Sequence, residues 1–431
     1  MRGAVKARKE NLRAAAVRAL QLMLEQGKSL TDAVPDDAAP LLREMVFGVT
    51  RWYWRLQADA GELLQKPLRR KDQDLELLIL VGVYQLGELR IPAHAVINET
   101  VDAAGNLGKS WAKGLINGVL RNYDRQRGNP DSALSEEARY CHPHWLLAHI
   151  RKSWPAHWQR ILEANNERAP MVLRVNRRRM TREEYLECMR RHDVNGRIDG
   201  LSEDGLILEK PIPVRELPGF EAGWVSVQDT AAQWAAPVLP IQSGGRILDA
   251  CSAPGGKLTH ILERYPQAGD VVAIDVSAER AAKIRDNLQR LDLSADVRVA
   301  DAGDLAGWWD GTPFDVVLLD APCSGSGVIR RHPDIKHLRR PEDLKRLASV
   351  QARLLDRLWQ TVATGGVLLY VTCSLFPEEN EDQVERFLAS HTDAVSRQIS
   401  APSGRYGRYG LQTLPGVHNV DGFYYALVQK N

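Results

Sequence analysis

The stretch Leu248-Asp249-Ala250-Cys251-Ser252-Ala253-Pro254-Gly255-Gly256-Lys257 decides the fold of this 431-residue chain. It continues a strand-like apolar run that begins at Arg246. Two later passages also follow apolar runs: Asp320-Ala321-Pro322-Cys323-Ser324-Gly325-Ser326-Gly327 and Val371-Thr372-Cys373-Ser374. Strands that alternate with helical patterns predict a parallel sheet. Because such sheets bind ligands beyond the carboxyl ends of their strands, we expect the three passages to meet in one cleft.

Around this α/β domain the chain is long enough for further domains. Residues 1–130 show helical periodicity without strand alternation, which predicts an all-helical domain. Gly128-Asn129-Pro130-Asp131 is predicted to be a linker. Residues 140–215 combine strand-like runs with a helix capped by Thr181, which predicts a small α/β module. Residues 216–431 are predicted to form the doubly wound α/β domain.

Composition limits the class of protein. Hydrophobic residues make up 44% and charged residues 26%, and the net charge is +2, so any nucleic-acid footprint must be local. The five cysteines show no CxxC pair and no Cys/His spacing of a metal site, which argues against disulfides and metal and favours a reducing cytoplasm. No signal peptide is apparent, and the apolar run from Leu77 to Val83 is too short to span a membrane. We expect a cytoplasmic monomer.

The loop from Cys251 to Lys257 consists mainly of small residues, which let a ligand approach the backbone closely. Asp275 ends the next strand-like run, where a carboxylate typically binds ribose hydroxyls. Neither GxGxxG nor GxxxxGK[ST] is present, so a phosphate is not the obvious target. S-adenosylmethionine fits, with Asp301 near the adenine and Asp320 near the methionine part. The alternative is that these are ordinary carboxylates at strand ends.

Two cysteines at strand ends add a chemical clue. Carbon 5 of a pyrimidine is a poor nucleophile, but a thiolate that adds to carbon 6 makes it able to attack a methyl donor. Cys373 precedes Pro377-Glu378-Glu379, a predicted helix start whose positive end would stabilise a thiolate, although the two glutamates would offset part of that effect. Inert packing is the alternative interpretation for a cysteine in a buried strand.

Asp320-Ala-Pro-Cys323, Thr372-Cys373-Ser374 and Ala253-Pro-Gly-Gly-Lys257 resemble the RNA cytosine-5 methyltransferase family, the Sun or Fmu group. The resemblance implies a Rossmann-like class I methyltransferase domain. It implies Cys373 as nucleophile, Cys323 as the residue assisting product release, and Asp320 near both cytosine and cofactor. It also implies that S-adenosylmethionine is bound by Cys251, Ser252, Ala253, Pro254, Gly255, Gly256, Lys257, Asp275, Asp301 and Asp320.

The resemblance extends over nearly the whole chain. Glu163-Ala-Asn-Asn-Glu-Arg168 is similar to the family's entry into its small, RRM-like module. Gly114-Leu-Ile-Asn-Gly-Val-Leu-Arg121 and Arg90-Ile-Pro-Ala-His94 resemble an all-α NusB-like RNA-binding domain. This combination of domains implies 16S ribosomal RNA as the substrate.

Arg330, Arg331 and Lys336 follow the Pro-Cys passage and could contact an RNA phosphate, or could belong to a solvated turn. Two alternative functions stay open at this point. The same chemistry could act on transfer RNA, or the chain could be a non-catalytic RNA-binding factor of ribosome assembly.

Overall fold

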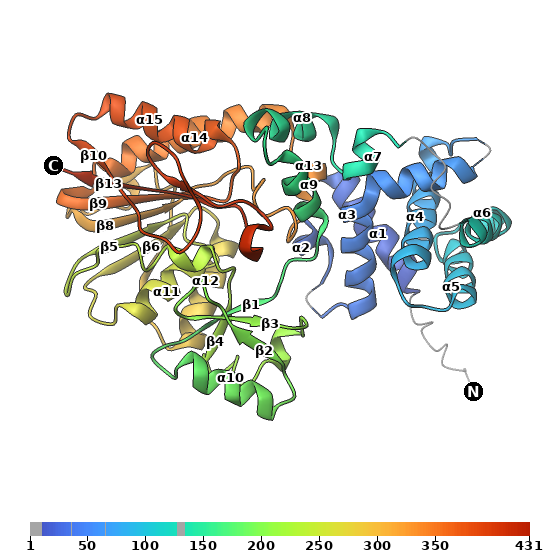
Figure 1. Cartoon of the computed structure of the whole chain (residues 1–431), viewed down its shortest axis with the longest axis horizontal. Helices are drawn as coiled ribbons and strands as arrows, with labels where there is room; N and C mark the ends of the chain where they lie inside the picture. Colours follow the sequence, from blue (N-terminus) through green and yellow to red (C-terminus); the bar gives the residue numbers. More distant parts are fainter. Residues whose placement is uncertain (1–10, 36, 65, 127–133) are drawn as a thin grey trace, which may run out of the picture. The chain divides into compact units, whose positions relative to one another are not determined.

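The computed structural model describes residues 11–35, 37–64, 66–126 and 134–431 (Figure 1). The linker predicted at residues 128–131 lies outside them. The chain forms two compact units. The first contains the residues up to Glu167 together with Ile329–Arg339, and the second contains Arg168–Val328 and Arg340–Asn431.

In the described ranges, the regular structure of the first unit is all helical. Its long helices bury one apolar core that includes Leu20, Met45, Val49, Leu78 and Ile116. The helix α1 ends at Gly27, which takes the left-handed conformation. The helices of this unit are α1 (Leu12–Gln26), α2 (Leu30–Ala33), α3 (Pro40–Leu63), α4 (Gln73–Glu88), α5 (Ala93–Asn106), α6 (Lys113–Gln126), α7 (Glu136–Tyr140), α8 (His144–Ser153), α9 (Trp158–Asn166) and α13 (Ile335–Leu338).

The boundary of this unit differs from the predicted start of the small module at residue 140. The helices α7 to α9 belong to the helical unit, because α7 packs against α3. More unexpectedly, residues 329–339 belong to the helical unit too, although they follow the Pro-Cys passage directly in sequence.

The small module is an antiparallel sheet within the second unit. Its strands β1 (Val172–Val175), β2 (Gly196–Ile198), β3 (Gly205–Leu208) and β4 (Val225–Val227) lie in the order β2-β3-β1-β4. The helix α10 (Arg182–Arg191) packs on the sheet through Tyr185 and Met189. It begins with the predicted capping box, in which Thr181 and Glu184 bond reciprocally.

The large sheet carries the predicted parallel strands. Five of them run parallel: β7 (Asp296–Val299), β6 (Val271–Asp275), β5 (Ile247–Ala250), β8 (Phe314–Asp320) and β9 (Val362–Thr372). The sheet continues antiparallel from β9 through β13 (Tyr424–Lys430) and β12 (Leu411–Gln412) to β11 (Arg405–Tyr406), with β10 (Ala394–Arg397) also on β13. It is therefore a mixed sheet whose order reverses between β5 and β8, and that is where ligands bind in this type of fold.

Helices cover both faces of this sheet (Figure 1). The helices α11 (Gly256–Arg264) and α12 (Ala278–Leu291) pack on one face through Leu258, Ile261 and Ile284. The helices α14 (Pro341–Trp359) and α15 (Glu381–Ser390) pack on the other through Leu354 and Phe387. Within the described ranges, no helix has the length and hydropathy needed to cross a bilayer.

Candidate active site

The loop after β5 is shaped by its own backbone and by Asp275 at the end of β6. Gly255 has a φ of +95°, and a Cβ there would lie 3.3 Å from Ile284 Cγ2. The carboxylate of Asp275 accepts hydrogen bonds from the backbone of Ala253 at 3.2 Å and of Ser277 at 3.1 Å. This carboxylate therefore fixes the loop against the neighbouring strand, as a carboxylate facing a bound ribose would have to be fixed.

Lys257 on the first turn of α11 joins this loop to the end of β8. Its ammonium lies 2.6 Å from Asp320 Oδ2 and 5.3 Å from the centre of the Phe423 ring. The first passage and the Asp-Ala-Pro-Cys passage are thus in direct contact, as the strand-end argument predicted.

Asp249 is a buried carboxyl below the same loop, which sequence reasoning did not select. Ser252 Oγ donates to it at 2.6 Å, and burial raises the pKa of Asp249 to about 7. The only signal in the sequence was a carboxylate inside an apolar strand. Burial and the nearby Asp320 also raise the pKa of Cys251 to about 12, so this thiol is protonated and acts as packing.

The two cysteines at the ends of β8 and β9 face each other. Cys323 Sγ lies 3.3 Å from Cys373 Sγ, and both thiols are reduced and half-buried. The hydrogen bond to Cys373 and burial hold the pKa of Cys323 well above its ordinary value. Either thiol of the pair can donate to the other, so the two sulfur atoms are within reach of one proton.

The buried Glu379 locks the two cysteine loops together. Its Oε1 accepts from the backbone of Ser324 at 2.8 Å and from Gln351 Nε2 at 3.1 Å, while its Oε2 accepts from Ser374 Oγ at 2.5 Å. From the sequence, Glu379 was expected only to place a negative charge at the start of a helix. In the structure, residues 377–379 form a single 3-10 turn and α15 begins at Glu381, so the predicted helix start is displaced.

Glycine backbones make a second connection between these loops. The Gly327 amide donates to the Cys373 carbonyl at 2.9 Å, and the Gly422 amide donates to the Gly327 carbonyl at 2.8 Å. A Cβ on Gly327 would lie 2.0 Å from the Gly422 oxygen, so no side chain fits there. The spacing between the two sulfur atoms is therefore set by rigid backbone contacts.

Asp301 lies just beyond β7, whose last residue Val299 pairs with Asp275. Its side chain is 44% exposed and forms an ion pair with Arg353 at 3.1 Å. The Asp301 carboxylate is therefore open to solvent at the edge of the sheet, where the adenine of the cofactor was expected to lie.

Comparison with known proteins decides the family. The family described as 16S rRNA methyltransferase RsmB/F matches residues 236–429, the ferredoxin-like domain of RsmF/B-like methyltransferases matches residues 142–215, and the NusB family matches residues 10–125. Ribosomal RNA small subunit methyltransferase B of Pseudomonas syringae pv. tomato is 46% identical over 97% of each chain. The protein of that name from Vibrio cholerae is 48% identical over 97% of this chain and 98% of its own. The chain belongs to the RsmB/F family.

Membership of the RsmB/F family confirms the predicted layout of an all-α NusB-like domain, a small α/β module and a Rossmann-like methyltransferase domain. The crystal structure of PH0851 has the same fold, with a TM-score of 0.83 at 23% identity over 99% of this chain and 100% of its own. The predicted enzyme class, an rRNA methyltransferase, is confirmed as well.

Two of the three residues that were predicted to contact RNA are buried. Lys336 is 1% exposed and donates to the Arg51 carbonyl at 2.7 Å, the Cys141 carbonyl at 2.7 Å and Asn166 Oδ1 at 2.9 Å. Arg330 is also 1% exposed, while Arg331 is half-buried. The expectation of a phosphate contact is wrong for Lys336 and Arg330, because both side chains are buried and Lys336 already has three acceptors within the helical unit.

His337 is buried beside Lys336. Its ring stacks on Trp54 with centroids 4.6 Å apart, and its Nε2 lies 2.9 Å from the Thr50 carbonyl. Residues 335–338 thus form a short helix that completes the core of the helical unit. As for metals, the part of the chain that the structure describes has no cluster of His, Cys, Asp or Glu suited to a cation.

Proposed function

We propose that this RsmB/F-family protein transfers a methyl group from S-adenosylmethionine to carbon 5 of a cytosine in 16S rRNA. The observation that carries the proposal is the cysteine pair at 3.3 Å, held beside the loop that follows β5. Methylation of a nitrogen or an oxygen needs no covalent help, whereas carbon 5 needs a thiolate that adds to carbon 6. Two facing cysteines therefore favour carbon as the acceptor.

In this proposal Cys373 forms a bond from its sulfur to carbon 6 of the cytosine. S-adenosylmethionine, when bound, supplies the methyl group that carbon 5 receives. The proton on carbon 5 must then leave, and the bond between Cys373 and carbon 6 must break to regenerate the thiolate. Cys323 is the nearest titratable partner of Cys373 and is placed to assist this release. Asp320 is held by Lys257 and would face the cytosine and the cofactor.

The residues at the strand ends fit this cofactor chemically. Three carboxylates at the same edge, those of Asp275, Asp301 and Asp320, can accept hydrogen bonds from ribose hydroxyls and amines. Gly255 gives the loop its left-handed turn and lets it pack closely on Ile284. Cys251, Ser252, Ala253, Pro254, Gly256 and Lys257 complete the cradle.

One exposed face of the helical unit is suited to holding RNA. Trp111 is 67% exposed beside the start of α6, and Leu115 follows it on the same face. Arg121 and Arg125, further along α6, are exposed. Within the described ranges neither guanidinium forms an ion pair with a carboxylate. Exposed aromatic and guanidinium groups suit stacking on a base and contact with phosphates. A cytoplasmic monomer acting on rRNA remains part of this proposal.

The test uses purified protein, labelled S-adenosylmethionine and protein-free 16S rRNA from a strain that lacks the enzyme. The RNA is digested to nucleosides, and label in 5-methylcytidine supports the proposal. Label in any other nucleoside contradicts the carbon-5 mechanism. Label that appears only when transfer RNA is supplied contradicts the substrate. A Cys373→Ala protein serves as the matched control and should give no label.

A further inference from the structure

A buried arginine of the small module touches the start of the helix that follows the β5 loop. Arg174, on β1, is fully buried, and all five of its N–H groups are engaged. Its Nε and Nη2 donate to the two carboxylate oxygens of Glu263 at 2.9 and 2.7 Å, and Nη2 donates also to Thr259 Oγ1 at 2.9 Å. Its Nη1 donates to Gln228 Oε1 at 2.5 Å and to the Gly256 carbonyl at 2.6 Å.

Three of these acceptors lie on α11, and the Gly256 carbonyl belongs to the cradle itself. Thr259 Oγ1 in turn donates to the Gly255 carbonyl at 2.9 Å. One guanidinium therefore holds the first turn of α11, from which Lys257 reaches Asp320. A planar fork with fixed donor directions sets position and orientation together, which a single ammonium cannot do.

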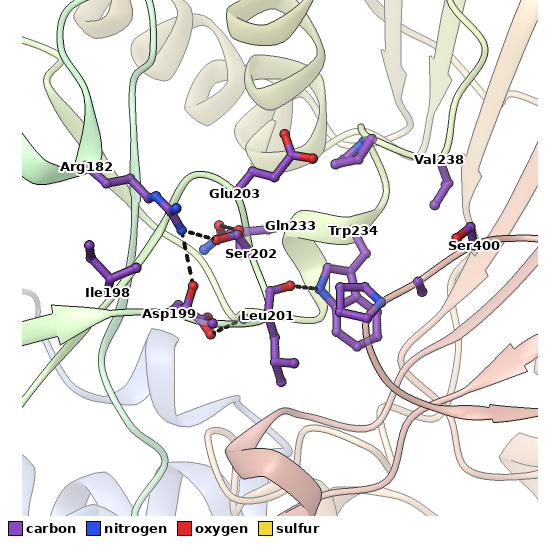
Figure 2. Close-up of a pocket in the computed structure, with 14 residues that line it drawn as sticks. Arg182, Ile198, Asp199, Leu201, Ser202, Glu203, Gln233, Trp234, Val238 and Ser400 are labelled. Atoms are coloured by element: carbon purple, nitrogen blue, oxygen red, sulfur yellow. Dashed lines mark hydrogen bonds between the residues drawn. The ribbon is translucent and has the colours of Figure 1, made fainter.

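The loop between β2 and β3 supports the same helix. Asp204 lies 2.9 Å from His260 Nε2, and Glu203 pairs with Arg264 at 2.7 Å. Figure 2 shows how this loop is held: Arg182 donates to the carbonyls of Asp199 and Ser202, and Trp234 donates to Leu201. The loop also borders a cavity of about 520 Å³ that is separate from the cysteine site.

A chain of hydrogen bonds joins this loop to Arg174. Ser202 Oγ donates to Gln233 Oε1 at 2.5 Å, and Gln233 Nε2 donates to the Gln228 carbonyl at 3.0 Å. The Gln228 side chain then accepts from Arg174. The small module thus contacts α11 through polar groups at its first turn and near its end.

We infer that Arg174 is a positioning residue for the cofactor, so that the small module forms part of the cofactor site in addition to any contact with RNA. The inference rests on the proposed function, because it assumes that S-adenosylmethionine binds at the β5 loop. Arg174 itself would not touch the cofactor. It acts through the Gly256 carbonyl and Thr259.

The experiment measures binding of S-adenosylhomocysteine to the full-length protein by calorimetry in the absence of RNA. Arg174→Lys keeps a positive charge beside Glu263 but cannot reach the Gly256 carbonyl at the same time. We expect the Kd to rise about tenfold. Thr259→Val keeps the shape of the side chain and removes only the hydroxyl, so it tests the same link with little risk to folding, and we expect a rise of about threefold.

Arg179→Gln is the matched control. Arg179 also links the small module to the methyltransferase domain, but through an exposed ion pair with Asp292 at 3.0 Å. Asp292 directly follows the last residue of α12. The Kd of the Arg179→Gln protein for S-adenosylhomocysteine should stay within twofold of the wild-type value. In steady-state kinetics the Arg174 and Thr259 variants should raise the KM for S-adenosylmethionine and leave the KM for rRNA unchanged.

The outcomes separate the two claims. If the wild-type protein does not bind S-adenosylhomocysteine, the proposed function fails. If wild type binds and both Arg174→Lys and Thr259→Val bind equally well, the inference fails. A parallel loss of rRNA and cofactor affinity would also overturn it, because general disruption of the fold would then explain the result.

Discussion

Replacing Lys336 by methionine tests whether this residue is a structural element of the helical unit. Methionine has a similar length and can be buried, but it removes the amine and the hydrogen bonds that the amine donates. The Arg51 carbonyl lies within α3 and keeps a helical partner. The Cys141 carbonyl and Asn166 Oδ1, by contrast, lose the ammonium as a donor.

The magnitude follows from these two acceptors. A buried acceptor without a partner costs about 1–3 kcal/mol, and burial of the apolar methionine offsets part of that cost. We expect the free energy of unfolding to fall by about 3 kcal/mol at pH 8.5. For a unit of this size the corresponding fall in Tm is about 6–12 °C. Lys152→Met, an exposed lysine on α8 of the same unit, should change Tm by less than about 2 °C.

The pH dependence has a definite sign. Burial lowers the pKa of Lys336 to about 7 in the folded protein, against about 10.5 in the unfolded chain. Above pH 7 only the unfolded chain keeps this proton, so the wild-type protein gains stability as the pH rises from 7 toward 10.5. The methionine variant lacks this gain. Its deficit should therefore shrink from about 3 kcal/mol at pH 8.5 to about 1 kcal/mol at pH 6.5.

Calorimetry of wild type and both variants at pH 6.5 and 8.5 measures these quantities. The reasoning is refuted if Lys336→Met unfolds at the wild-type temperature at pH 8.5. It is equally refuted if the deficit is the same at both pH values, because the buried amine would then be charged in the folded protein over the whole range.

Three further outcomes are expected. Cys323→Ala should accumulate a covalent adduct with RNA and Cys373→Ala should form none, as seen on denaturing gels with labelled 16S rRNA; an adduct that survives without Cys373 would assign the nucleophile to another residue. Gly327→Ala must displace the Gly422 carbonyl that lies 2.0 Å from the new Cβ, and a shift of about 1 Å between the cysteine loops should lower kcat about 100-fold; wild-type kcat would mean that the loops are not rigid. Arg121→Gln and Arg125→Gln should each reduce the dependence of log Kd on log salt by about 0.7 in filter binding to single-stranded rRNA segments, with unchanged affinity for S-adenosylhomocysteine; an unchanged salt dependence would remove this face from the RNA-binding surface.

The sequence alone was sufficient for the parts of the site that depend on local pattern. A strand followed by small residues and a carboxylate is a short-range signal, and parallel pairing then brings the ends of β5, β6, β8 and β9 to one edge. The contacts of Lys257 with Asp320 and of Cys323 with Cys373 followed from that rule. The antiparallel strands β10, β11 and β12 are only two to four residues long, which is too short to show a strand pattern in the sequence.

Long-range burial could not be predicted in this way. Lys336 stands among Arg330, Arg331, Arg339 and Arg340, which is the composition of a solvated, phosphate-binding turn. Its acceptors come from residues 51, 141 and 166, and no local pattern connects these positions with residue 336. The partners of Glu379 and Arg174 could not be predicted for the same reason, since a charged side chain reveals its partners only when the fold supplies them.

Residues 329–339 belong to the helical unit, and their late position in the sequence affects how this unit folds during synthesis. Ribosomes add about 5–20 residues per second, and an N-terminal domain usually folds while the rest of the chain is still being synthesised. Here the last helix of the N-terminal unit is encoded about 170 residues after the unit's other helices end at Asn166. The unit must therefore wait about 10–30 s during synthesis with its site for α13 empty. During that time the Cys141 carbonyl and Asn166 Oδ1 lack the donor that Lys336 later supplies, and a nascent chain released before residue 339 cannot complete either unit.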